Sequence, residues 1–340
     1  MVGIVDVARA AGVSTATVSR ALSDNPNVSQ KTKDLVKKFA DQLGYVPSAT
    51  AYTLVTGRTR NIGVVMPFID RWFFSTVLDE IERDLVDAGY DLTLYNLHGT
   101  GGTRDAVFTK LLPRKRVDAV LAVAVKLTES ELDALSNVSK PVLGIGGPIA
   151  GSYSLAIDDV AAGRLATEHL LSLGHRDIGM VGQVEKDSHL FKVPNQRRIG
   201  YEEALVAAGV KFRDAWFKPT DSHSIDEGYA AAKQLLGDPR NAPTAIVTST
   251  DELAFGAIMA AKDLGLRVPE DLSVVGIDNH DMSSFFNLTT VSQDVRGQGK
   301  ALVRMLLEVL DGEGNAKLPP VTKWPIDLVV RGSTSRLRQN

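Results

Sequence analysis

Residues Asp6–Leu22 read DVARAAGVSTATVSRAL, and this stretch decides the fold of the N-terminal region. Its first apolar residues are Val7, Ala8 and Ala11. Together with Ile4, just before the stretch, they recur at the spacing of one helix face. Gly12 is expected to end that helix, and Ser14 to cap a second helix over residues 15–22, because its hydroxyl can accept a hydrogen bond from a free amide. Two short helices joined by a tight glycine-containing turn are typical of a helix-turn-helix unit.

A third helix is expected after the turn-rich residues 23–27, with Ser29 as its N-cap and Gly44 at its end. Its buried face should consist of Leu35, Val36, Phe39, Ala40 and Leu43. The three helices together predict a small all-α domain over residues 1–45.

The second helix of such a unit lies in the major groove with its N-terminal side chains toward base edges. This geometry makes Thr15, Ala16 and Arg20 the candidates for reading sequence. Arg20 is the strongest, because its guanidinium can bond O6 and N7 of one guanine together. Phosphate anchors are expected at polar residues around the unit: Thr17, Ser19, Asn27, Ser29, Lys31 and Thr32. For Ser14 and Ser29, helix capping alone explains the residue type equally well.

Charge is distributed unevenly along the chain. Residues 1–60 hold eight Lys or Arg and four Asp, a net charge of +4. The other 280 residues hold the remaining 30 basic and 37 acidic residues, so the net charge of −3 of the whole chain is an average. A basic segment on an acidic chain is typical of a nucleic-acid-binding arm, although chance on a solvated surface gives the same count.

Composition restricts the function classes. The chain has 340 residues, enough for two or three domains, and 44% of them are hydrophobic. It contains no cysteine, which excludes disulfides, thiolate metal sites and cysteine nucleophiles. No apolar run approaches the roughly 18 residues that cross a bilayer, and the N-terminus lacks a secretory signal. We therefore expect a cytoplasmic protein with no membrane partner.

From residue 61 onward, apolar strands alternate with amphipathic helices. Strands are expected at 61–67, 91–97, 118–125, 141–147, 177–182, 244–248 and 272–277. Such alternation predicts parallel sheets covered by helices on both faces. The fold class is therefore α/β: a helix-turn-helix domain followed by two doubly wound parallel-sheet subdomains. A ligand would bind between them, beyond the carboxyl ends of the strands.

The chain resembles the lactose repressor (LacI/GalR) family of bacterial transcription regulators. The resemblance rests on residues 6–22 and 28–47, and on 166–176, 197–201, 251–257, 268–271, 275–278, 288–291 and 330–333. It implies a helix-turn-helix domain at 1–45, a hinge at 46–60, and an effector-binding and dimerisation domain at 61–340 that is similar to periplasmic sugar-binding proteins. In this last domain the chain would cross between subdomains near Asp158, Gln293 and Pro320. The N-subdomain would comprise about 61–159 and 292–320, and the C-subdomain about 160–291 and 321–331.

The hinge has room for about two helical turns between Pro47 and Gly57. A helix this short is marginal in water and needs DNA or a partner to hold it. The resemblance implies that the hinge helices of a homodimer enter the minor groove, with Leu54 as the wedge that opens a central base step. A plain flexible linker is the alternative.

A sugar effector requires polar side chains that bond its hydroxyls and a flat aromatic surface for its C–H faces. Six residues are candidates for this site: Trp72, Phe73, Arg197, Thr250, Asp278 and Gln293. The resemblance supplies Arg197, which is carried over from the family's ligand-binding arginine, and also Thr250 and Gln293, which match positions that line the family's pocket. Thr250 stands where the family often has Asn. For Trp72, a place in the core is an equally good explanation.

An enzyme is the main competing class. Residues 144–151 look like a dinucleotide-binding loop, but Pro148 and the residues after it favour a turn over the helix start that such a loop requires. His169 and His175 have no partner at metal-ligand spacing, and no serine nucleophile elbow occurs. We expect no enzyme, no cofactor and no metal site. A purely structural DNA-bending protein is disfavoured by the large cleft domain.

The expected function is a homodimeric transcriptional repressor of sugar-metabolism or sugar-uptake genes that binds operator DNA. It would release the DNA when a sugar in the cleft stabilises a conformation that holds the hinges apart. A regulator that responds to a purine, or to a phosphorylated carrier protein, is the alternative.

Overall fold

The computed structural model describes residues 2–23, 25–45, 53, 57–97, 102–114, 116–137, 140–184, 191–312 and 318–338. The N-terminal domain consists of α1 (Ile4–Ala11), α2 (Thr15–Leu22) and α3 (Gln30–Leu43), as the sequence predicts. Gly12 ends α1 in the left-handed conformation, with φ of 65°. Ser14 and Ser29 cap α2 and α3, each accepting a hydrogen bond from the backbone amide three residues on.

The core of this domain is small and built mainly from Val and Ala: Val7, Ala8, Ala11, Val18, Ala21, Val36 and Ala40. Phe39 packs against its edge. The prediction that Leu35 and Leu43 are buried is wrong, because their side chains are 40% and 37% exposed. Both lie at the margin of the apolar stripe of α3, where the short helices α1 and α2 do not reach.

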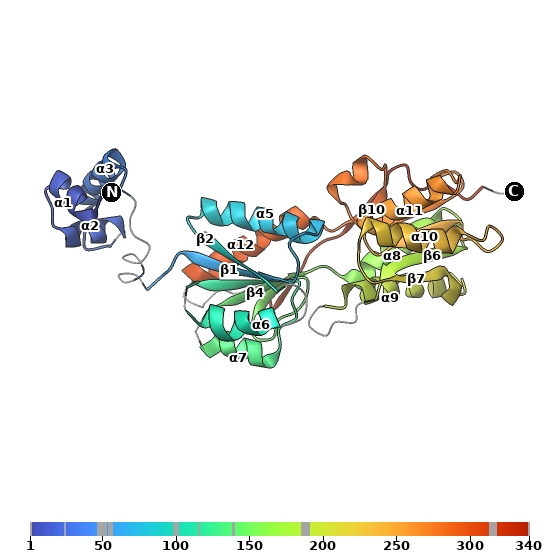
Figure 1. Cartoon of the computed structure of the whole chain (residues 1–340), viewed down its shortest axis with the longest axis horizontal. Helices are drawn as coiled ribbons and strands as arrows, with labels where there is room; N and C mark the ends of the chain where they lie inside the picture. Colours follow the sequence, from blue (N-terminus) through green and yellow to red (C-terminus); the bar gives the residue numbers. More distant parts are fainter. Residues whose placement is uncertain are drawn as a thin grey trace.

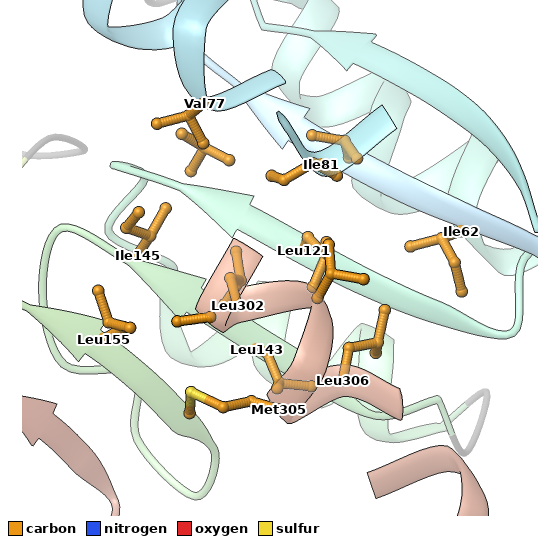
Figure 2. Packing of buried hydrophobic residues seen from close by; sticks show 14 of the residues in the cluster. Ile62, Val77, Ile81, Leu121, Leu143, Ile145, Leu155, Leu302, Met305 and Leu306 are labelled. Atoms are coloured by element: carbon orange, nitrogen blue, oxygen red, sulfur yellow. The ribbon is translucent and has the colours of Figure 1, made fainter. Parts of the chain in front are cut away.

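The N-subdomain contains a six-stranded parallel sheet in the order β11-β5-β4-β3-β1-β2. Its strands are β1 (Asn61–Met66), β2 (Asp91–Asn96), β3 (Ala119–Val123), β4 (Val142–Ile145), β5 (Tyr153–Ala156) and β11 (Val321–Lys323). One face is covered by α5 (Trp72–Asp87) and α12 (Val295–Asp311); Figure 2 shows Val77 and Ile81 of α5 and Leu302 and Leu306 of α12 against the strands. The other face carries α6 (Gly102–Ala106), a π-helix (Val107–Leu111), a 3-10 turn (Leu112–Arg114) and α7 (Glu129–Asn137).

The C-subdomain repeats this arrangement in a second sheet of the order β12-β10-β9-β8-β6-β7. Its strands are β6 (Ile178–Gln183), β7 (Phe217–Thr220), β8 (Ala245–Thr248), β9 (Ser273–Asp278), β10 (Thr289–Ser292) and the antiparallel edge strand β12 (Asp327–Val329). Helices α8 (Asp159–Ser172) and α9 (Val193–Ala207) cover one face. Helices α10 (Ile225–Leu236) and α11 (Asp251–Asp263) cover the other. Figure 1 shows the subdomain as a separate group of strands and helices, with α8, α9, α10 and α11 labelled. Two doubly wound parallel sheets therefore confirm the expected fold class.

The chain crosses between the subdomains three times, between β5 and α8, between β10 and α12, and between β11 and β12. The first two crossings lie at 157–158 and 293–294, beside Asp158 and Gln293. The third lies at 324–326, after the expected Pro320, because residues 321–323 form β11 and pair with β5 of the N-subdomain. No described helix is long and apolar enough to cross a membrane.

Helices α8 and α9 pack backbone to backbone at a pair of glycines. A Cβ atom on Gly163 would lie 1.9 Å from the carbonyl oxygen of Arg197, and one on Gly200 would lie 1.9 Å from that of Val160. Only glycine permits this approach. The contact matters for the site because it brings the side chain of Arg197 on α9 against Asp159 at the start of α8.

Substitution of Gly200 by Ala should destabilise the C-subdomain by about 3 kcal/mol or more, because the added methyl group meets rigid backbone. Chemical denaturation of the two proteins measures the loss. Gly63→Ala in β1 of the N-subdomain is the control, since the added methyl group would meet a side-chain atom of Tyr95 at 3.2 Å as its closest neighbour. An equal loss of unfolding free energy in the two variants would show that the contact of α8 with α9 at Gly200 is no tighter than the packing around Gly63.

Candidate functional site

A cavity of about 140 Å³ lies between the two subdomains, at the carboxyl ends of their parallel strands. Its walls come from segments that follow strands on both sides: Phe68, Arg71, Trp72, Phe73, Phe74, Ala124 and Gly146 from the N-subdomain, and Gln183, Phe191, Arg197, His223, Thr250 and Asp278 from the C-subdomain. Asp159 and Gln293, next to the first two crossings, also line it, as do Ile157, Val193, Pro194, Glu252 and Gln298. The position is the one expected for a ligand site in doubly wound sheets.

The guanidinium of Arg197 is the electrostatic centre of this cavity. Its Nε donates to Asp159 at 2.9 Å, and its Nη1 donates to the carbonyl oxygen of Ser249 at 2.6 Å and to Asp278 at 3.3 Å. All three charged side chains are buried. The Nη2 group makes no hydrogen bond within the described part of the chain, so it is available to a ligand.

Asp278 lies at the end of β9 and offers an acceptor beside that donor. Its Oδ1 receives hydrogen bonds from Arg197 and, at 2.6 Å, from Gln293, while Oδ2 has no partner among the described residues. Its φ of 135° is a backbone conformation that residues other than glycine rarely adopt, and strain of this kind concentrates at functional sites. Burial raises the pKa of Asp278 to about 7, against the opposing effect of Arg197.

Aromatic side chains face the cavity from both subdomains. Trp72, Phe73 and Phe74 lie at the start of α5, and Phe191 lies just before α9 on the opposite side. The cavity thus combines apolar ring faces with a small number of buried charged groups, which is the usual composition of a site for a small organic ligand.

Three buried polar atoms near the ends of β7 and β8 have no hydrogen-bond partner among the residues that the structure describes: Oγ1 of Thr220, Nδ1 of His223 and Oγ of Ser249. Buried polar atoms are rarely left in this state, and each costs about 1–3 kcal/mol when unsatisfied. His223 lines the cavity itself. Burial lowers the pKa of His223 to about 3, so at neutral pH its uncharged ring offers one donor and one acceptor.

All six effector candidates named from the sequence line this cavity. Two carry structural duties as well: Thr250 caps α11 by accepting from the amide of Leu253, and Trp72 donates to Asp281 at 3.3 Å. That any of the six contacts an effector stays a prediction. Sequence reasoning missed Asp159, Gln183, Phe191 and His223. Only Asp159 had a signal in the sequence, because it is an acidic residue directly after the crossing that was expected near Asp158.

The DNA-reading candidates of α2 lie on its surface. Thr15, Ala16 and Arg20 are exposed, and Nε of Arg20 donates to the carbonyl oxygen of Ala16 at 3.1 Å, which anchors the guanidinium on the helix. Among the phosphate candidates, Thr17 and Thr32 share their hydroxyls with Ser14 and Ser29 within the caps. Ser19 is half-buried, and Asn27 and Lys31 are exposed. Leu54 lies outside the described residues.

The two segments that suggested other chemistry have structural roles. Residues 146–152 form a turn that leads into β5, so no helix begins there as a dinucleotide-binding loop requires. His169 bonds the hydroxyl of Thr334, and His175 bonds the carbonyl oxygen of Ser335, and together they hold the C-terminal segment against the C-subdomain. No group of three metal-ligating side chains occurs in the described ranges.

Comparison with known proteins agrees with this arrangement. Residues 3–48 match the model of bacterial regulatory proteins of the lacI family, and residues 167–334 match the periplasmic binding protein-like domain. The HTH-type transcriptional repressor PurR of Vibrio vulnificus (strain CMCP6) is 34% identical over 346 residues, which cover 99% of this chain and 100% of that protein.

Two solved structures extend the similarity to three dimensions. The Lac repressor dimer bound to operator and the anti-inducer ONPF has a TM-score of 0.80 at 26% identity, covering 98% of this chain and 99% of that one. A transcriptional regulator CelR–cellobiose complex has a TM-score of 0.69 at 26% identity, covering 98% of this chain and 100% of that one.

Fold and site together define a class of protein: a helix-turn-helix DNA-binding domain attached to a two-subdomain ligand-binding domain. Within this class the chain belongs to the LacI family of bacterial regulatory proteins and is a DNA-binding transcriptional repressor. Its relatives and structural neighbours are transcription regulators, which confirms the prediction that it is not an enzyme.

Replacing Arg20 by Ala should lower the preference for operator over random DNA by roughly 10- to 100-fold, because a bidentate arginine–guanine contact is lost. Non-specific binding should keep its salt dependence, since it rests on phosphate contacts. Fluorescence anisotropy on an operator selected from random DNA, and on a scrambled duplex, measures both. Lys37→Ala on the exposed face of α3 is the control. Unchanged preference in Arg20→Ala would rule out its role in reading sequence.

Proposed function

We propose that this repressor binds a small sugar-type effector in the cleft between its subdomains and that the bound effector releases it from operator DNA. The observation that carries the proposal is a pair of adjacent buried groups that can still form hydrogen bonds. Among the described residues, Nη2 of Arg197 has no acceptor and Oδ2 of Asp278 has no donor. A hydroxyl group both donates and accepts, so two neighbouring hydroxyls on a ring match a donor and an acceptor held side by side.

The aromatic walls support the same ligand class. The C–H faces of a sugar ring can pack against Trp72 and Phe73, while its hydroxyls reach Arg197 and Asp278. The unsatisfied Nδ1 of His223 gives one further bonding position in the cavity. The similar CelR protein was solved in complex with cellobiose, which adds a precedent in a related chain.

A purine effector is the second candidate, favoured by the name PurR of the curated relatives. A flat heteroaromatic ring can also pack on an aromatic side chain, and Trp72 and Phe191 line the cavity from the two subdomains. Thermal shift of the full chain against ribose, cellobiose and glucose, and against hypoxanthine, guanine and adenine, separates the two. Stabilisation by a sugar that also weakens operator binding supports the proposal. Stabilisation by a base alone supports the purine alternative, and the absence of both contradicts an effector role for the cleft.

Asp278→Ala should leave operator affinity within about threefold of the unsubstituted protein while raising the effector concentration needed for release by at least about tenfold, because a charge-assisted hydrogen bond is lost. The effector found in the thermal-shift panel is titrated into the operator complex. A normal response in this variant would show that the effector binds elsewhere.

The same titration should depend on pH. With a pKa of about 7, Asp278 is mostly ionised at pH 8 and mostly protonated at pH 6. The ionised carboxylate accepts hydrogen bonds from hydroxyl donors more strongly than the protonated form, so effector affinity should fall as pH drops, by up to about tenfold between pH 8 and pH 6. Asp278→Asn cannot titrate and should remove this dependence. A pH dependence that persists in Asp278→Asn would assign it to another group.

We also propose that the chain acts as a homodimer, because one helix-turn-helix unit reads only half of a symmetric operator. Exposed apolar side chains in the C-subdomain support a dimer contact there. Met259, Met282 and Phe285, which we call the apolar patch, are 46%, 42% and 87% exposed. Met259 lies on α11, and Met282 and Phe285 lie on the segment after β9; the stacked rings of Phe255 and Phe286 join these two elements. The similar Lac repressor was solved as a dimer on its operator.

Phe285→Glu should raise the dimer dissociation constant by at least about tenfold, because a charge would be buried in an apolar contact. Sedimentation equilibrium measures the change. Val206→Glu on α9, also strongly exposed, is the control outside the patch and should have no effect. Identical dissociation constants for all three proteins would exclude the patch as the dimer surface.

A further inference from the structure

A group of side chains that includes the cavity residue Trp72 joins the two subdomains at one edge of the cleft. Trp72 and Glu80 lie on α5 and Arg296 lies on α12, all in the N-subdomain. Across the cleft, His280 and Asp281 follow β9 in the C-subdomain. Asp281 accepts from both partners on the opposite side, from Arg296 at 2.9 Å and from the indole Nε1 of Trp72 at 3.3 Å.

The N-subdomain half of this contact is held by a buried carboxylate. Glu80 is only 2% exposed and lies between three cations, Arg83 at 3.3 Å, Arg296 at 3.2 Å and Lys300 at 3.7 Å. Because a buried charge requires its partners, Glu80 fixes one end of the Arg296 guanidinium. The other end is then directed at Asp281.

The C-subdomain half is held by the core. The ring of His280 stacks on Trp72, with ring centroids 4.5 Å apart and an angle of 29° between the planes, and meets Phe255 edge-on at 5.3 Å. The backbone amide of His280 donates to Asp251 at 2.8 Å, and its Nδ1 accepts from the amide of Met282 at 2.9 Å. Trp72 therefore rests against a rigid surface that belongs to the other subdomain.

We propose that Asp281 and Arg296 are positioning residues for Trp72, and that the three form a latch that holds this wall of the effector cavity and sets the separation of the subdomains. Trp72 is the only one of the three that lines the cavity among the described residues. A ligand that packs on Trp72 therefore acts on the same side chain that the latch holds. This inference deepens the proposed effector function, but the latch itself exists without a ligand.

The latch is weak enough to open. The side chains of Arg296 and Asp281 are 47% and 59% exposed, and an ion pair at such a site shifts an equilibrium by about fivefold at most. Their attraction is also screened by salt. A contact of this strength can shift a conformational equilibrium several-fold without locking it, which is what a reversible response to a small molecule requires.

Fluorine NMR of the full chain labelled with 5-fluorotryptophan tests the proposal without any effector. The chain has three tryptophans, so three signals are expected, and Trp72→Phe identifies that of Trp72. Arg296→Gln should move the Trp72 signal toward the position of solvent-exposed indole and narrow it, while the signal of buried Trp216 stays in place. Arg296→Lys, which keeps the charge, should restore part of the shift.

The control is Arg267→Gln, which removes an ion pair of better geometry within the C-subdomain, with Asp271 at 2.7 Å. It should leave the Trp72 signal unchanged. Raising NaCl from 50 to 500 mM should move the signal of the unsubstituted protein in the direction of Arg296→Gln, and should not move that of Arg296→Gln further.

A second measurement addresses the subdomain separation. The sequence has no cysteine, so Ser136→Cys on α7 and Ala207→Cys on α9 give two exposed sites for spin labels, one on each subdomain. Arg296→Gln should broaden the measured distance distribution, whereas Arg267→Gln should not. A Trp72 signal and a distance distribution that are both unchanged in Arg296→Gln would overturn the latch. Because neither readout uses an effector, this failure is distinct from a failure of the effector titrations.

Discussion

The cleft depends on one interaction, the burial of the Arg197 guanidinium between Asp159 and Asp278. A buried cation without partners costs several kcal/mol, so this arginine is tolerable only where both carboxylates and the carbonyl oxygen of Ser249 meet it. The three partners come from α8, from the end of β8 and from the end of β9. The burial of a single charge thus requires these elements of the C-subdomain to keep one relative position.

The same interaction ties the cavity to the segments that connect the subdomains. Asp159 follows the first crossing directly, and Gln293, which donates to Asp278, lies in the second. A ligand that changes the hydrogen bonds of Asp278 therefore acts on residues next to the crossings at 157–158 and 293–294, about which the subdomains would rotate. Gly163 and Gly200 supply the geometric condition, because only their close contact brings Arg197 of α9 to Asp159 of α8.

Local signals were sufficient to predict the N-terminal helices, since capping serines and a left-handed glycine act within a few residues of the ends that they define. Buried central strands such as β1 and β3 were predictable from continuous apolar runs. The strands β5, β7, β10, β11 and β12 were not, because each has only three or four residues and mixes polar with apolar ones, unlike the apolar runs of β4 and β8. Phe191 and His223 could not be found either: they lie on loops, and only the sheet order places them at the cavity.

The distribution of charge in the C-subdomain explains why coupling between ligand and conformation needs few contacts. Strong, buried bonds around Arg197 keep one subdomain rigid, while the contact from Trp72 and Arg296 to Asp281 across the cleft is exposed and weak. Binding energy in the cavity therefore cannot be absorbed by deforming the buried network, and it acts on the weaker contact between the subdomains. A small ligand with a differential affinity of a few kcal/mol for one arrangement is then sufficient to shift the population, and the hinges leading to DNA would follow.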